Sequence, residues 1–259
     1  MFTPLAKSLT KVSQVWVSTY DALTARICEE AGVDVILVGD SVANVYLGFS
    51  STVQISLEAM KIFTGAVSRS VSIPVVADIP FESTHSLDSI KRAAVGLIKE
   101  GASAVKLEIP SKEAVDWIMS VAELGIEVVA HIGLTPQTFM KIGGYKKRGK
   151  EKSDAQYLIK LAKLCENAGA SCLVLEMVKP EVAGEITESL SIPTIGIGSG
   201  SNTTGQVLVF ADLVGLNPDA PPFVKKFANC YQEALSGCKA FVETVKEGKG
   251  EAKVTKIAD

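Results

Sequence analysis

The chain has 259 residues, of which 47% are hydrophobic and 21% charged, and its formal net charge is −3. This composition is typical of a soluble globular protein with a large core, and the length suits one α/β barrel or two smaller domains. The acidic balance argues against a nucleic-acid partner or an anionic membrane surface, since both need clustered cations. We interpret the basic cluster at 143–152, "GGYKKRGKEK", as a solvated loop, with an anion-binding lip as the alternative.

The sequence also indicates where the protein works. Its apolar runs fall far short of the roughly 20 residues that a membrane-spanning helix needs. The first residues, "MFTPLAKSLTKVSQ", lack the long apolar region of a secretory signal. The five cysteines are odd in number, scattered and never spaced CxxC, which favours reduced thiols over disulfides or a zinc site. We therefore expect a cytoplasmic protein with no membrane partner.

Eight short β-rich segments recur along the chain, and segments with helical spacing of apolar residues lie between them. Several helical segments end in a glycine directly before the next strand, as in "EEAGVDVILV", which is typical of the turn from a helix into a strand. The β-rich segments are apolar almost throughout, and this indicates a parallel sheet covered by helices. They cover residues 15–19, 33–40, 73–80, 103–110, 126–133, 171–178, 192–200 and 207–215.

Eight such strands in a chain of this length predict the α/β class and a (β/α)8 TIM barrel. We expect a single domain over residues 1–259, with a flexible tail at 246–259 that is rich in charge. A doubly wound open sheet is the alternative. It is disfavoured because no glycine-rich dinucleotide fingerprint follows the first strand.

Polar residues stand at the C-terminal ends of the predicted strands, and a barrel would bring these ends to one face. Taken alone, Asp40 could cap a helix, Asp78 could form a turn and His131 could be a core histidine with satisfied hydrogen bonds. Six ionisable groups at five strand ends together predict an active site instead. The six are Asp40, Asp78, Lys106, Glu108, His131 and Glu176, and Ser41 stands beside Asp40 at the same strand end.

The residue types suggest a chemistry. Asp40, Asp78 and Glu108, with no cysteine or paired histidine, form an oxygen-rich donor set that suits Mg²⁺. Lys106 could form a structural ion pair with Glu108, two residues away on the same side of a strand, or could attract an anionic substrate such as a 2-oxo acid. A cation holding the substrate's carboxylate and keto oxygens would stabilise an enolate. Glu176, away from the metal, is then the predicted base that removes a proton α to the ketone.

Several motifs occur in an order that resembles the ketopantoate hydroxymethyltransferase family, within the phosphoenolpyruvate mutase/isocitrate lyase superfamily. The resemblance covers roughly residues 15–230, and its most specific pieces are "VGDS" and "HIGLTPQ". It implies Mg²⁺ at Asp40, Asp78 and Glu108, and Glu176 as the proton acceptor. It implies substrate contacts from Asp40, Ser41, Asp78 and Lys106, with His131 in the substrate pocket. The other motifs are "VVADIPF", "AVKLE", "GGYK", "LVLE", "IPTIGIGSG" and "FVKKFA".

The resemblance also implies a reaction. Members of the family transfer a hydroxymethyl group from 5,10-methylenetetrahydrofolate to 3-methyl-2-oxobutanoate, giving 2-dehydropantoate on the pantothenate route to coenzyme A. They commonly form homo-oligomers, often decamers. Two alternatives stay open, namely another Mg-dependent C–C lyase, aldolase or mutase of the superfamily acting on a different 2-oxo acid, and a non-catalytic barrel. The missing "KKCGH" signature counts against the first, and the presence of the base and all three metal carboxylates counts against the second.

Overall fold

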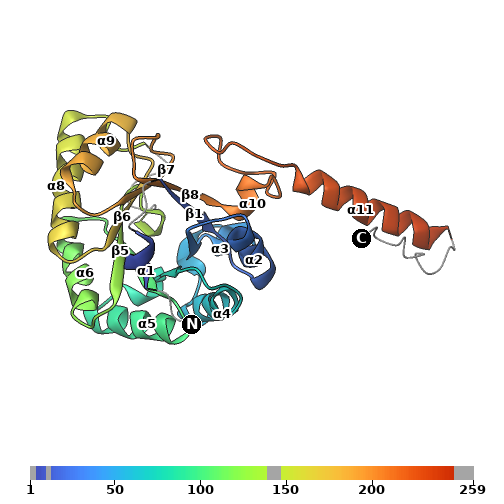
Figure 1. Ribbon diagram of the computed structural model, residues 1–259, viewed down its shortest axis with the longest axis horizontal. Coiled ribbons are helices and arrows are strands. Elements are labelled where there is room, and N and C mark those ends of the chain that lie inside the picture. Colours follow the sequence, from blue (N-terminus) through green and yellow to red (C-terminus); the bar gives the residue numbers. More distant parts are fainter. Residues whose placement is uncertain (1–3, 10–12, 139–146, 248–259) are drawn as a thin grey trace. The chain divides into compact units, whose positions relative to one another are not determined.

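The computed structural model describes residues 4–9, 13–138 and 147–247 (Figure 1). Eight strands form a closed barrel in chain order, and each pairs in parallel with the next, with the last returning to the first. The predicted (β/α)8 barrel is thereby confirmed. The strands are β1 (Gln14–Ser18), β2 (Val35–Val38), β3 (Val75–Asp78), β4 (Ala104–Glu108), β5 (Glu127–Gly133), β6 (Cys172–Glu176), β7 (Thr194–Ile197) and β8 (Gly205–Val209).

Helices surround the strands on the outside of the barrel (Figure 1). The longer ones are α2 (Ala22–Glu30), α4 (Leu57–Ser68), α5 (Leu87–Lys99), α6 (Val115–Ala122), α8 (Lys152–Asn167) and α9 (Pro180–Ser189). Short helices are α1 (Leu5–Ser8), α3 (Val42–Val45) and α10 (Phe210–Leu213). Four 3-10 turns complete this part of the chain, namely η1 (Thr52–Gln54), η2 (Phe81–Ser83), η3 (Lys112–Ala114) and η4 (Pro136–Thr138).

Local sequence signals explain where these helices begin and end. The side chains of Asp21, Ser56 and Ser86 accept hydrogen bonds from backbone N–H groups in the first turns of α2, α4 and α5, as N-caps do. The glycines that follow α2, α5, α6 and α8 all have a positive φ, between +77° and +104°. A side chain at these positions would be strained, so glycine ends the helix and directs the chain into the next strand.

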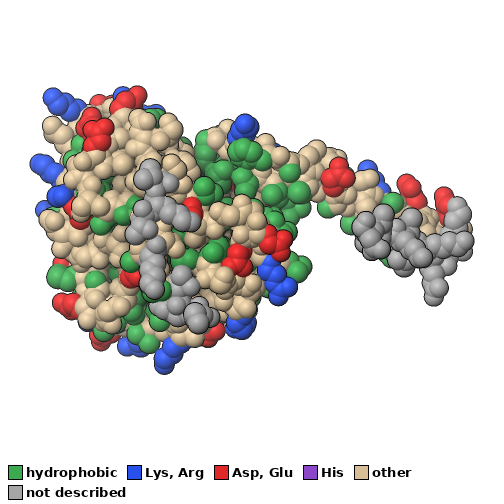
Figure 2. All heavy atoms as spheres, in the orientation of Figure 1, with side chains coloured by type: hydrophobic (Ala, Val, Ile, Leu, Met, Phe, Trp, Pro, Cys, Tyr) green, Lys and Arg blue, Asp and Glu red, His purple; other side chains and the backbone are tan. Residues whose placement is uncertain are grey.

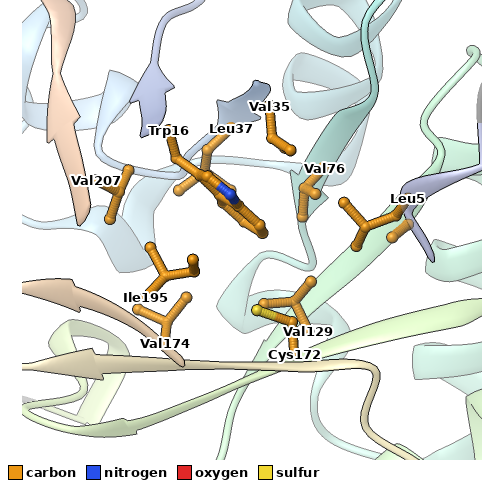
Figure 3. Close-up of a cluster of buried hydrophobic side chains, with 11 residues drawn as sticks. Leu5, Trp16, Val35, Leu37, Val76, Val129, Cys172, Val174, Ile195 and Val207 are labelled. Atoms are coloured by element: carbon orange, nitrogen blue, oxygen red, sulfur yellow. The ribbon is translucent and has the colours of Figure 1, made fainter. Parts of the chain in front are cut away.

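The barrel interior is filled by apolar side chains from successive strands (Figure 3). Trp16, Val76, Val129 and Val174 are among these buried residues, and Leu5 from α1 joins them. Because successive side chains of a strand point to opposite faces, the residues two positions further along also point inward. Two residues after Val76, Val129 and Val174 come Asp78, His131 and Glu176, which are polar residues of the predicted site. The predicted site therefore lies next to the apolar core, towards the C-terminal ends of the strands.

Two predicted segments differ from what the structure shows. The last predicted strand, at 207–215, is β8 at Gly205–Val209, and the chain turns into α10 at Phe210 because the pairing with β1 ends at Val209. In the predicted solvated loop at 143–152, residues 143–146 lie outside the described residues. Arg148 of that loop is partly buried, and its guanidinium donates hydrogen bonds to Asp154 at 2.7 Å and to the Gly133 carbonyl at 2.9 Å.

The chain divides into two compact units, Met1–Phe210 and Ala211–Asp259. The first contains the barrel. The second contains α11 (Cys230–Lys246), a 17-residue helix, after a turn in which the Asn217 amide donates to Asp212 at 2.7 Å. The expectation of one domain over residues 1–259 stays a prediction. Residues 248–259 of the expected flexible tail lie outside the described residues.

Charged side chains of both signs stand along the outer helices on the face drawn in Figure 2. Within the described ranges, no helix combines the length and the apolar character needed to cross a membrane.

Candidate active site

The polar residues predicted from the strand ends meet at the C-terminal mouth of the barrel. The register of the sheet sets Asp78 beside Lys106 and Glu108 beside His131 on neighbouring strands. All four side chains are buried. Glu176 is the last residue of β6, and it pairs with Gly133 on β5. The structure therefore brings together residues that lie up to about a hundred positions apart in the chain, at the face where such barrels place their active sites.

Asp40 and Ser41 reach this mouth from the turn after β2. The backbone N–H of Asp40 donates to Asp78 Oδ2 at 3.0 Å, and Ser41 Oγ shares a hydrogen bond of 2.7 Å with the Tyr20 hydroxyl. α3 begins after Ser41, whose side chain makes no capping hydrogen bond. Helix capping therefore does not explain this pair of polar residues. A Cβ at Gly39 before them would lie 2.8 Å from Ser41 Oγ, so a larger residue there would displace the Ser41 side chain.

Lys106 lies at the centre of the group. Its Nζ is 3.1 Å from Asp78 Oδ1 and 3.4 Å from His131 Nδ1. Burial acts to lower the pKa of Lys106, but the attraction of Asp78, Asp40 and Glu108 outweighs it and raises that pKa above its ordinary value. Lys106 is therefore a cation at neutral pH, and its ion pair is with the neighbouring strand and not with Glu108 two residues away.

The carboxylates outnumber this lysine. Burial raises the pKa of Asp78 to about 7, with Lys106 lowering it and Asp40 raising it further. Burial and the charge of Asp40 likewise raise the pKa of Glu108 well above its ordinary range. A desolvated site with this excess of carboxylate oxygen favours a bound hard cation, which would lower both pKa values.

The donor set thus fits Mg²⁺ in chemistry, although it is not arranged as a finished site. Across the described residues, no group of three or more His, Cys, Asp or Glu side chains is gathered so that it could hold a metal ion as it stands. Lys106 holds Asp78 in an ion pair, and the Gln137 amide donates a hydrogen bond to Asp40 Oδ2. The predicted metal set of Asp40, Asp78 and Glu108 stays a prediction.

His131 faces three ionisable groups and is only 2% exposed. Its Nδ1 is 3.4 Å from Lys106 Nζ and 3.8 Å from Glu108 Oε1, and its Nε2 is 3.3 Å from Glu176 Oε2. Burial and the charge of Lys106 lower the pKa of His131, so the ring is neutral at pH 7. The contact with Glu176 falls short of hydrogen-bond geometry, and Nε2 is a buried nitrogen without a hydrogen-bond partner among the described residues. His131 is thus part of the polar group and not a satisfied core histidine.

Glu176 is the most accessible of the six ionisable residues of the group, with 17% of its side chain exposed. Its backbone is held closely, because its carbonyl accepts a hydrogen bond from the Leu134 N–H at 2.8 Å. Gly133 permits this approach, since a Cβ at that position would lie 2.3 Å from the Glu176 carbonyl oxygen. The geometry leaves a carboxylate on a rigid strand end that faces His131 and the barrel mouth.

Gln137 also belongs to the site, and the sequence analysis did not identify it. Its Nε2 donates to Asp40 Oδ2 at 2.8 Å and to the Ile79 carbonyl at 3.0 Å, while its backbone N–H donates to Glu108 Oε2 at 2.9 Å. Gln137 lies inside "HIGLTPQ", four residues after β5 ends. A glutamine in a turn after a proline is typical of an ordinary loop. Its place in the motif "HIGLTPQ" was the only feature of the sequence that pointed to a role in the site.

The fold defines the class of protein. This chain is similar in structure to a phosphonopyruvate hydrolase that was solved in complex with oxalate and Mg²⁺. The TM-score of this comparison is 0.65 at 15% sequence identity, and it covers 98% of this chain and 90% of that chain. 2,3-Dimethylmalate lyase, described as a PEP mutase/isocitrate lyase superfamily member, has a TM-score of 0.64 at 17% identity, over 99% and 93%. At this level of identity the comparison shows a shared barrel fold.

Sequence comparison gives the family. The family model for ketopantoate hydroxymethyltransferase matches residues 4–250. A protein of Thermotoga sp. (strain RQ2) named 3-methyl-2-oxobutanoate hydroxymethyltransferase is 47% identical over 247 residues, 94% of this chain and 91% of that protein. A protein of Ignicoccus hospitalis with the same name is 44% identical over 237 residues, 91% and 90%. This chain belongs to the ketopantoate hydroxymethyltransferase family, and the predicted family and enzyme class are confirmed.

Proposed function

We propose that this protein transfers a hydroxymethyl group from 5,10-methylenetetrahydrofolate to 3-methyl-2-oxobutanoate, giving 2-dehydropantoate for pantothenate and coenzyme A synthesis. The observation that carries the proposal is the buried Lys106–Asp78 pair beside two further carboxylates, with Glu176 facing His131 at the same barrel mouth. The names of the relatives, at up to 47% identity, indicate the acceptor. The net change forms a bond between C3 of the 2-oxo acid and the one-carbon unit and breaks the two bonds that join this unit to folate nitrogens. Water supplies the hydroxyl group, and the C3 proton and the second water proton end on the two folate nitrogens, giving tetrahydrofolate.

The side chains divide the work as follows. Asp40, Asp78 and Glu108 would hold Mg²⁺, which would supply electrostatic stabilisation of negative charge on the substrate's oxygens. Lys106 would supply a buried positive charge for the anionic substrate, and Ser41, in the turn after β2 at the same barrel mouth, would offer a hydroxyl group. The neutral ring of His131 lines the pocket, with Nε2 aimed at the space beside Glu176. Glu176 accepts the C3 proton.

The donor is tested by comparing one-carbon sources. With 3-methyl-2-oxobutanoate and Mg²⁺, we expect 5,10-methylenetetrahydrofolate to support formation of 2-dehydropantoate and free formaldehyde alone to do so poorly, because a folate-dependent transferase gains rate from binding the whole donor. Initial rates are measured by chromatography of the product, with enzyme-free mixtures as the control. Equal rates with formaldehyde alone would indicate an aldolase, the alternative member of the same superfamily.

We also propose a homo-oligomer, with the decamer implied by the family resemblance as the expected size. Support comes from α11, in which no residue is buried although Tyr231, Leu235, Val242 and Val245 repeat at helical spacing along one face. Most of the stability of a helix in a protein comes from packing of its apolar face, and an exposed apolar stripe is typical of an interface. The five free cysteines support a reducing, cytoplasmic location.

The apolar stripe gives a test of assembly. Val242→Asp is expected to shift the protein to smaller species in size-exclusion chromatography with light scattering, because a carboxylate cannot be buried there unpaired. Glu243→Gln, at an exposed position of the same helix, is the matched control and should leave the mass unchanged. A monomeric wild type, or a Val242→Asp variant of unchanged mass, would contradict the assignment of this face.

A further inference from the structure

Gln137 donates hydrogen bonds to two of the three carboxylates that are proposed to hold the metal, and to the backbone of the residue next to the third. Its side-chain amide donates to Asp40 Oδ2, its backbone N–H donates to Glu108 Oε2, and the same amide donates to the carbonyl of Ile79, the residue directly after Asp78. These three hydrogen bonds measure 2.8, 2.9 and 3.0 Å. Gln137 is itself buried, at 7% exposure.

We propose that Gln137 is a positioning residue for the divalent cation, which orients the carboxylates of Asp40 and Glu108 from behind. The inference rests on the metal site in the proposed function. Gln137 occupies one oxygen of each carboxylate, Oδ2 of Asp40 and Oε2 of Glu108. The other oxygen of each group accepts no hydrogen bond from Gln137, and that of Glu108, Oε1, lies 3.8 Å from His131 Nδ1. Carboxylate ligands are commonly held in this way by outer hydrogen bonds, which fix their orientation and tune their affinity.

The turn that carries Gln137 is well suited to hold a position. Gln137 is the central residue of η4, which Thr135 and Thr138 close with a hydroxyl–hydroxyl hydrogen bond of 2.6 Å and a backbone hydrogen bond of 2.9 Å. Leu134, just before the turn, is joined to Glu176 by its N–H. Pro136 restricts the backbone further. A rigid turn with a buried amide can hold two carboxylates that come from different βα units, Asp40 after β2 and Glu108 at the end of β4.

The choice of an amide has an electrostatic consequence. Lys106 already compensates part of the negative charge of the site. A second lysine or arginine in place of Gln137 would cancel more of the charge that attracts a divalent cation. A neutral amide supplies N–H donors to the carboxylate while leaving its charge in place. Gln137 thus orients the ligands without competing electrostatically with the metal.

The test measures metal binding directly, without turnover. Mn²⁺ serves as the probe, because it is a hard divalent cation for oxygen ligands and its free form is quantified by electron paramagnetic resonance. Gln137→Met keeps the length of the side chain and the backbone N–H to Glu108 but removes the amide donor. Gln137→Asn keeps the amide and shortens its reach. Gln156→Met, at an exposed position of α8, is the matched control.

Both Gln137 variants are expected to bind Mn²⁺ more weakly by a factor on the order of 10–100, the usual effect of removing an outer-shell partner. Gln156→Met should bind as the wild type does. Thermal melting without metal shows that each variant is folded, so that Kd is compared between folded proteins. Unchanged or tighter Mn²⁺ binding by folded Gln137→Met and Gln137→Asn would overturn the inference about Gln137. Failure of the wild type itself to bind Mn²⁺ would instead overturn the proposed metal site.

Discussion

Asp40→Ala is expected to abolish turnover while leaving the barrel folded. If Asp40 is a metal ligand, its loss removes stabilisation worth several kcal/mol from the transition state, and about 4 kcal/mol corresponds to a factor on the order of 10³ in rate. The fold should survive because the side-chain amide of Gln137 keeps its second acceptor, the Ile79 carbonyl. Initial rates of 2-dehydropantoate formation, with circular dichroism melting curves, measure both effects.

Asp78→Ala is expected to abolish turnover in the same way, with a larger loss of stability. Asp78 forms a buried ion pair with Lys106 at 3.1 Å, so its removal leaves a buried ammonium without that partner. Breaking such a pair typically costs about 3–5 kcal/mol. Asp40 and Glu108 still attract Lys106 and reduce this cost, and we expect the variant to fold with a lower melting temperature.

Metal removal completes this test. Wild-type enzyme in excess chelator should lose activity, and added Mg²⁺ should restore it. Asp88→Ala, at an exposed position in the first turn of α5, is the matched control and should behave as the wild type does. Full activity of the wild type in excess chelator would refute the metal requirement, whatever the variants show.

The fold could be predicted because its signals are local. Each buried strand is a short apolar run, and glycines with positive φ, such as Gly32 and Gly101, mark the turns from helices into strands. The site residues could be predicted because a barrel collects the ends of its strands at one face. The inward orientation of Lys106 and His131 follows from the rule that alternate residues of a strand point to the same side.

The pairing inside the site could not be predicted in the same way. Lys106 and Glu108 lie two positions apart on one strand, which suggested an ion pair, yet the ammonium turns to Asp78 across the sheet because the register places the two side by side. Gln137 was missed because its partners lie 29 to 97 positions away in sequence. Such contacts depend on the path of a turn after Pro136, which no periodicity encodes.

Glu176→Gln is expected to lower both C3 proton exchange and turnover by a factor on the order of 10² or more, the usual effect of removing a positioned base. The amide has nearly the same shape as the carboxylate but cannot accept the proton. Because Glu176 is not one of the proposed metal ligands, binding of Mg²⁺ and 3-methyl-2-oxobutanoate should change little. Deuterium uptake at C3, followed by NMR without the one-carbon donor, isolates this step from transfer.

The structure sharpens the distinction between a base and a structural carboxylate at this position. Glu176 Oε2 lies 3.3 Å from His131 Nε2 in a contact that falls short of a hydrogen bond, and 17% of the side chain is exposed, so little stability depends on its charge. Glu176→Gln should therefore melt within a few degrees of the wild type, as should the control Glu185→Gln at an exposed position of α9. A structural role predicts the reverse, namely a clearly less stable protein whose folded fraction exchanges C3 protons at the wild-type rate. Normal exchange in well-folded Glu176→Gln would remove Glu176 from the mechanism.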